Sequence, residues 1–83
     1  MRAEDSIDSA LSAALEAEKA VLGGILIDSA RFDDAAEILG ADDWFREAHR
    51  ILWDGYRRCT AAGTAIDLVT LRGVLTADEY ARI

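Results

Sequence analysis

The amino-acid sequence predicts an all-α fold, a small orthogonal bundle of four to five short helices. Apolar residues recur every three or four positions, as on one helix face, and no segment shows the alternation of a hairpin strand. The 83-residue chain has no proline, and glycine or small polar residues typical of helix ends separate its apolar segments. The connections are short, which favours helices that cross at steep angles. An apolar content of 52% is sufficient for one small core.

The first predicted helix covers residues 11–27, the most apolar part of the chain. Four leucines share one stripe at helical spacing: Leu11, Leu15, Leu22 and Leu26. Other apolar residues cover most of the circumference, so we expect neighbours to bury this helix from more than one side. Residues 1–10 are acidic and small, which predicts a flexible lead-in, with Ser9 or Ser12 as the N-cap. The folded domain is therefore expected over residues 11–83.

Three residues of this helix are unusual for their positions. Gly23 and Gly24 each cost about 1 kcal/mol relative to alanine, a cost usually offset by close backbone packing. Glu18 lies inside the apolar arc. We favour the interpretation that it complements the helix dipole from the first turn, or extends to water. The alternative is a partly buried carboxylate that holds a cation from another helix.

The second predicted helix covers residues 30–39, after a possible cap at Asp28 or Ser29. Gly40 stands at the position of a C′ glycine. A turn at Asp42 and Asp43 then leads into Trp44 and Phe45. The apolar face of this helix consists of Phe32, Ala35, Ala36 and Leu39.

The third predicted helix covers residues 45–62 and ends at Gly63. Its apolar stripe is expected to contain Phe45, Ala48, His49, Leu52, Tyr56 and Cys59. Four other residues lie off this stripe and could face a partner: Arg50, Trp53, Arg57 and Arg58. Taken one at a time, they are more simply explained as a solvated face with a half-covered tryptophan.

Two short helices are predicted at the end of the chain. Asp67 is the expected N-cap of the first, which follows an extended connector over residues 64–66. Its apolar residues are Leu68, Leu71, Val74 and Leu75. Thr76 and Glu79 match a capping box, which predicts the start of a fifth helix.

The composition excludes several classes of protein. Acidic residues outnumber basic ones by 16 to 9, and the net charge of −7 argues against direct DNA binding and favours a basic protein partner. Cys59 is the single cysteine, which excludes an internal disulfide and fits the reducing cytoplasm. The chain shows no secretory signal, and its most apolar helix is short and interrupted by charges, so a membrane span is not expected.

The motifs of common enzyme sites are absent from the sequence. It has no phosphate-binding Gly-x-x-x-x-Gly-Lys-Ser/Thr loop and no nucleophile elbow, and one histidine with one cysteine cannot complete a zinc site. We therefore expect neither catalysis nor a cofactor. His49 is interpreted as a buried structural residue that hydrogen-bonds either Glu18 or a backbone carbonyl, since an unpaired buried imidazole would cost roughly 1–3 kcal/mol.

Three segments together resemble the N-terminal domain of bacterial replicative DNA helicases of the DnaB type. Their order and spacing fit from Glu16 to Leu75, about three quarters of the chain. Two departures from the family pattern stand out. Ala13-Ala14 replace the usual proline and polar cap, which permits an earlier helix start, and Trp44-Phe45 replace the usual Phe-Tyr. The matching segments are residues 16–26, Asp43-Trp44-Phe45 with His49-Arg50-Ile51, and residues 66–71 after Gly63.

The resemblance implies a non-catalytic head domain of a longer helicase. In that family such heads form a collar on a hexameric ring, contact a DnaG-type primase and other helicase subunits, and precede a helical hairpin and a separate ATPase motor. A Gly-Gly…Tyr-Leu segment leads into that hairpin in the family, and this chain ends at Ile83, about where that segment should start. The resemblance thus implies a module for ring assembly and primase contact in DNA replication, and a monomer or weak dimer when isolated.

Two other functions remain open from the sequence. An acyl carrier protein is also acidic, helical and of this size, and Asp28-Ser29 precedes the second helix, but Ala30-Arg31 replace the residues usual there. A stand-alone mimic of the helicase head that regulates assembly would use the same surface as the helicase module. Incubation with a phosphopantetheinyl transferase would detect the first alternative, and the reading frame after Ile83 would decide the second.

Overall fold

The computed structural model of the chain describes residues 3–83, with side chains described from Ser6 onward. Helices, and no strands, make up the regular structure of this part, which confirms the all-α prediction. The helix α1 has 25 residues and is far longer than predicted. The elements in order are α1 (Ala3–Ile27), α2 (Arg31–Ala36), a 3-10 turn η1 (Ala41–Asp43), α3 (Glu47–Ala61), α4 (Leu68–Val74) and α5 (Ala77–Ala81).

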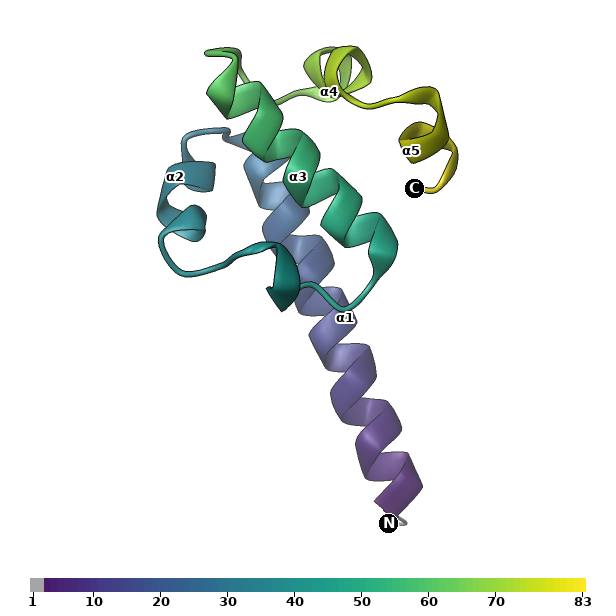
Figure 1. Cartoon of the computed structure of the whole chain (residues 1–83). Coiled ribbons are helices and arrows are strands. Elements are labelled where there is room, and N and C mark those ends of the chain that lie inside the picture. The colour runs from purple at the N-terminus through teal and green to yellow at the C-terminus, as the bar shows by residue number, and fades with distance from the viewer. Residues whose placement is uncertain (1–2) are drawn as a thin grey trace.

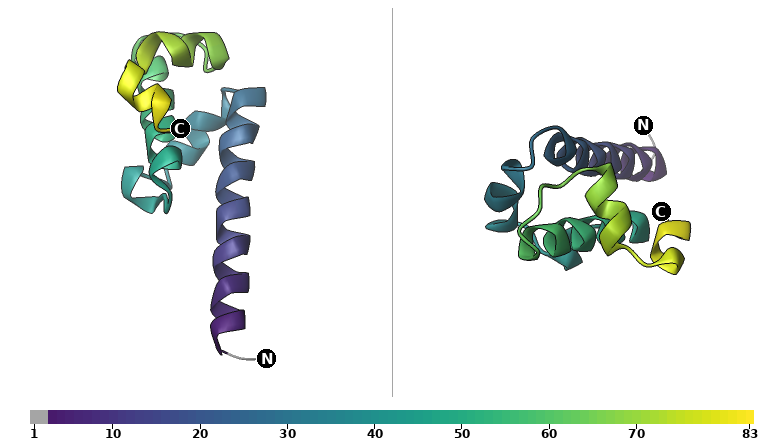
Figure 2. Two further views of the ribbon diagram at one scale, coloured as in Figure 1. Left: turned by 90° about the vertical axis from the view of Figure 1, so that its right-hand side faces the viewer. Right: turned by 90° about the horizontal axis from the view of Figure 1, so that it is seen from above.

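The fold consists of a compact head and a projecting helix (Figures 1 and 2). The head comprises α2 to α5 together with the C-terminal half of α1. Within it, α3 is central and packs against α1, η1 and α4. The N-terminal half of α1 extends away from the head, and the described chain is correspondingly elongated, at 48 × 28 × 20 Å.

The core of the head is aromatic on the side where α2 and η1 meet α3. The Trp53 ring lies 4.8 Å from the Phe32 ring and 5.2 Å from the Trp44 ring, centroid to centroid. The Tyr56 side chain is fully buried, and its hydroxyl donates to the backbone oxygen of Leu22 at 2.9 Å. The main core cluster contains Leu22, Ile25, Phe32, Trp44, Trp53, Tyr56, Cys59, Ile66 and Leu71.

Two predicted boundaries of the early helices were wrong. The helix α1 begins at Ala3 rather than at Ser9 or Ser12, because serines on a solvent-exposed helix face do not interrupt it. Residues 3–10 are thus helical, and residues 1–2 of the expected lead-in lie outside the described residues. The helix α2 ends at Ala36, and Gly40 has an extended φ of −121°, so it is not a left-handed C′ glycine.

The later helix ends agree with the sequence. Gly63, with φ of +72°, ends α3 in the left-handed conformation that favours glycine. The Asp67 carboxylate accepts a hydrogen bond from the Thr70 amide at 2.9 Å and caps α4. The Thr76 hydroxyl accepts from the Glu79 amide, and the Glu79 carboxylate accepts from the Thr76 amide, which completes the predicted capping box.

Candidate functional site

The first part of the candidate site is a partly buried contact between Glu18 of α1 and His49 of α3. The Glu18 Oε1 lies 2.6 Å from His49 Nδ1, and Glu18 Oε2 accepts a hydrogen bond from the Phe45 amide at 3.0 Å. The His49 residue is only 7% exposed, and the Trp44 ring lies edge-on to it at 6.4 Å. One carboxylate therefore joins α1, α3 and the segment that precedes α3.

This geometry decides between the two interpretations of Glu18. The favoured one, a first-turn glutamate or one that reaches water, was wrong, because α1 begins at Ala3 and Glu18 lies in the part that packs on α3. Burial raises the pKa of the Glu18 carboxyl, but hydrogen bonds from His49 and the Phe45 amide outweigh it, so the pKa lies below its ordinary value. The sequence left open whether His49 would hydrogen-bond Glu18 or a backbone carbonyl, and the structure shows Glu18 as its partner.

The two glycines of α1 do not mark a close helix contact. A Cβ at Gly23 would meet nothing within 4 Å, and one at Gly24 would meet only the Arg31 guanidinium at 3.8 Å, so the expected packing was wrong. The close approach is at Gly55 of α3, where a Cβ would lie 2.9 Å from Leu71 Cδ2 and 3.2 Å from Leu75 Cδ2. The signal that could have revealed it is a glycine in the middle of a strongly amphipathic helix.

The predicted partner surface on α3 is only partly exposed. Trp53 is 4% exposed, so its placement off the core was wrong: Phe32 and Trp44 approach α3 from a second side. Conversely, Phe45 is 63% exposed although the stripe predicted burial, because α3 begins at Glu47 rather than at residue 45 and Trp44 occupies the core instead. Leu68, on the expected face of α4, is exposed as the first residue after the Asp67 cap.

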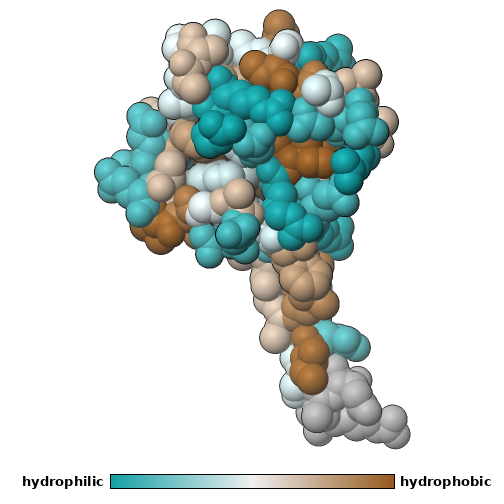
Figure 3. All heavy atoms as spheres, in the orientation of Figure 1, coloured by the Kyte–Doolittle hydropathy of each residue, from teal (hydrophilic) through white to brown (hydrophobic). Residues whose placement is uncertain are grey.

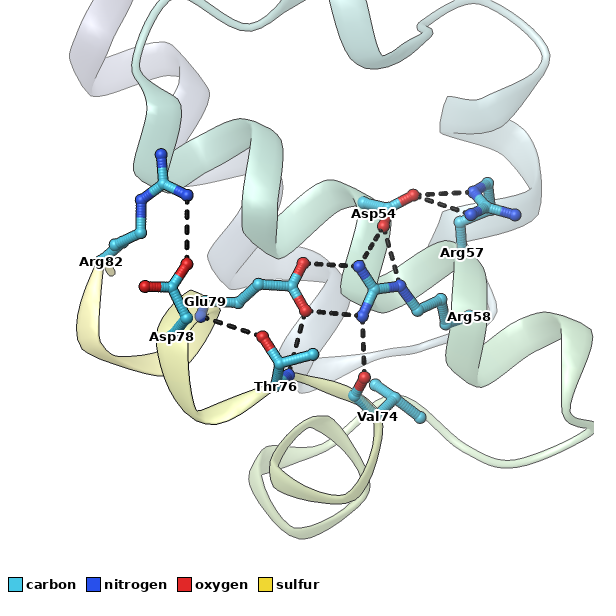
Figure 4. Close-up of polar contacts among 8 residues, drawn as sticks. All are labelled: Asp54, Arg57, Arg58, Val74, Thr76, Asp78, Glu79 and Arg82. Carbon is cyan, nitrogen blue, oxygen red and sulfur yellow. Dashed lines mark hydrogen bonds and ion pairs between the residues drawn. The ribbon is translucent and has the colours of Figure 1, made fainter.

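Arg58 is an internal connector rather than a free surface residue (Figure 4). Its guanidinium pairs with Asp54 and Glu79, each at 2.6 Å, and donates to the Val74 backbone oxygen at 2.8 Å. The hydrogen bond from Arg58 holds the pKa of Glu79 at about 2. The same carboxylates raise the pKa of Arg58 further above its ordinary value. Arg58 thus fixes α5 and the end of α4 to α3, a role the sequence did not indicate.

Arg50 and Arg57 remain as exposed cationic residues on α3. They are seven positions apart and so lie on one helix face. The Arg50 guanidinium donates to the backbone oxygens of Trp44 and Phe45, at 3.0 and 3.2 Å. Arg57 pairs with Asp54 at 2.8 Å, with its side chain 61% exposed. These contacts position both guanidinium groups while leaving them accessible.

Two further features of the described residues bear on chemistry. The Trp44 Nε1 atom is buried and has no hydrogen-bond partner there. Cys59 is a free, fully buried thiol.

Within residues 3–83, no helix combines the length and apolar character required to cross a membrane.

Comparisons with known proteins agree with the resemblance drawn from the sequence. The family model described as the DnaB-like helicase N-terminal domain matches residues 10–82. The replicative DNA helicase DnaB of Pasteurella multocida is 44% identical over 57 residues, which cover 69% of this chain. That of Geobacillus stearothermophilus is 40% identical over 65 residues, or 78% of the chain. The matched part spans only 12–14% of the length of these relatives. No solved structure matches the chain.

Proposed function

Because the chain belongs to the family of DnaB-like helicase N-terminal domains, we propose that it is a non-catalytic assembly and primase-interaction module of a replicative helicase. The match over residues 10–82 is the observation that carries this proposal. It favours the helicase module over the acyl carrier alternative. The module acts in DNA replication by supporting ring assembly and by contacting a DnaG-type primase and other helicase subunits.

The geometry of α3 supports a role in binding rather than catalysis. Its buried side holds His49 against Glu18, so this imidazole joins two helices and is not open to a substrate. Its accessible cations, Arg50 and Arg57, lie on one face and are held by Trp44, Phe45 and Asp54. Guanidinium groups arranged in this way suit pairing with carboxylates of a partner. We assign the partner contact to this face. Trp53 and Arg58, which the sequence also suggested for it, are not part of it because they contact the core and α5.

Isothermal titration of the 83-residue chain with a purified DnaG-type primase tests the proposal. We expect saturable binding, and weakening by about fivefold or more in the double variant Arg50→Ala/Arg57→Ala. Arg31→Ala is the matched control, since Arg31 is an exposed, singly paired arginine on α2. Absence of binding at about 100 μM would contradict the primase contact. Equal loss in the control would contradict its location.

A further inference from the structure

The projecting half of α1 carries an apolar stripe that no described residue covers. Ile7 is 66% exposed and Leu11 is 37% exposed. With Ala14 they follow the four- and three-residue spacing of one helix face, and the same face continues through Glu18 and Ile25 into the head. The apolar stripe of α1 is therefore buried within the head and exposed along the projecting part of the helix (Figure 3).

The stripe leads into an apolar groove where α1 reaches the head. This groove has a volume of about 260 Å³ and lies between α1 and the segment that contains η1. The stripe and groove together form one continuous surface on the side of α1 that faces the head. The residues that line the groove are Ala14, Ala17, Glu18, Val21, Leu39, Asp43 and Trp44.

The charges of this helix restrict what can cover the surface. From residue 3 to residue 18 the sequence contains acidic residues and no lysine or arginine. Lys19, the first basic residue after the stripe, already pairs with Glu16 at 3.2 Å. A second copy of the chain, with its net charge of −7, would bring like charges together along the stripe.

We propose that this surface, the exposed stripe of α1 with its adjoining groove, binds an amphipathic helix with basic flanks from a partner protein. The apolar face of that helix covers Ile7, Leu11 and the groove, while its lysines or arginines face the acidic flanks of α1, including Asp8. Helices bind apolar grooves through anchors at this same spacing, and complementary charge adds specificity and speed of association. This inference concerns α1 alone and does not depend on the primase contact assigned to α3.

Fluorescence anisotropy with defined peptides tests the inference on the full 83-residue chain. The probe is a labelled synthetic helix of about 20 residues with a leucine stripe and lysine flanks, compared with the same helix bearing glutamate flanks. We expect saturable binding of the lysine peptide that weakens with added salt, and no binding of the glutamate peptide. Ile7→Glu, Leu11→Glu and Asp8→Lys should each weaken binding, the first two by at least about tenfold.

Ile38→Glu is the matched control, because Ile38 is an apolar residue that is 83% exposed on the head. Its affinity for the peptide should stay within about twofold of the unsubstituted chain, and circular dichroism should show equal helix content in all variants. Equal binding by Leu11→Glu and Ile38→Glu would overturn the proposal, as would equal affinity for both peptides. Sedimentation that shows a dimer abolished by Leu11→Glu would assign the surface to a second copy instead.

Discussion

At the residue scale, the Glu18–His49 contact links α1 to α3 and, through the Phe45 amide, to the segment that precedes α3. It joins segments 31 positions apart in sequence and lies beside the aromatic core. A hydrogen bond to a charged group contributes about 1.5–3 kcal/mol, and a buried group left without its partner costs a similar amount. We therefore expect His49 to help set how α3 lies on α1, and with it the direction in which Arg50 and Arg57 face.

Replacing His49 with alanine should lower the free energy of unfolding by more than about 1 kcal/mol, because Glu18 loses its hydrogen bond to His49 and a cavity opens beside Trp44. Urea denaturation monitored by circular dichroism measures this. Thr60→Ala, an exposed change on the same helix, should have little effect. An unchanged His49→Ala stability would show that the contact does not anchor the helices.

The Glu79 carboxylate should make stability depend on acidity. Its pKa is about 2 in the folded chain because Arg58 donates to it, well below the ordinary value of 4.5. A carboxyl whose pKa is lowered by folding contributes stability above its unfolded pKa, and this contribution is lost as the pH falls toward the folded value. Glu79→Gln should therefore be less stable than the unsubstituted chain at pH 7, with the difference shrinking from pH 5 to pH 2. Denaturation curves that show a constant difference over this range would contradict this assignment.

At the element scale, the contact between α3 and α4 depends on a glycine in α3, whose missing side chain lets the two helices approach closely. Gly55 is buried on α3, and Leu71 of α4 and Leu75, the residue that follows α4, occupy the space where its Cβ would be. The short α4 contributes few core residues of its own, so its position depends on this close approach. The Arg58 contacts then fix the following turn and α5 to the same helix.

Gly55→Ala should destabilise the chain by about 1 kcal/mol, even though alanine favours helices by a similar amount. The added Cβ would lie 2.9 Å from Leu71 Cδ2, and Leu71 is itself only 4% exposed and cannot move freely. Gly73→Ala is the matched control, since a Cβ there meets nothing within 4 Å. Thermal unfolding should show a lower midpoint for Gly55→Ala and an equal or higher one for Gly73→Ala. The reverse order would contradict close packing at Gly55.

At the scale of the whole molecule, the acidic net charge of the chain disfavours binding to polyanions such as DNA. The net charge is −7, which disfavours contact with phosphates. The sequence carries no phosphate-binding loop.

The 83-residue chain should therefore neither hydrolyse ATP nor bind single-stranded DNA tightly at physiological salt. Anisotropy of a labelled oligonucleotide and a phosphate-release assay measure the two activities. Saturable DNA binding with a submicromolar dissociation constant would contradict this prediction, as would ATP hydrolysis that survives further purification.

The sequence by itself determined the fold class, the helix order and the later helix ends, because these depend on local periodicity and on caps such as Asp67 and Thr76. It also indicated that His49 is buried. The family was recognised because three short segments match the family pattern in the same order and at the same spacing. The start of α1 escaped prediction because exposed serines are compatible with either a cap or a helix interior.

Only the tertiary structure decided which side chains of different helices contact one another. A helical stripe gives one buried face, but α3 is covered from two sides, so Trp53 is buried, whereas Phe45 precedes α3 and is exposed. Glycine spacing does not say which glycine another helix approaches, and the close approach is at Gly55 rather than Gly23 or Gly24. Arg58 became a connector because α5 turns back to place Glu79 beside it, 21 positions along the chain. Such contacts depend on the relative placement of helices, which local sequence does not encode.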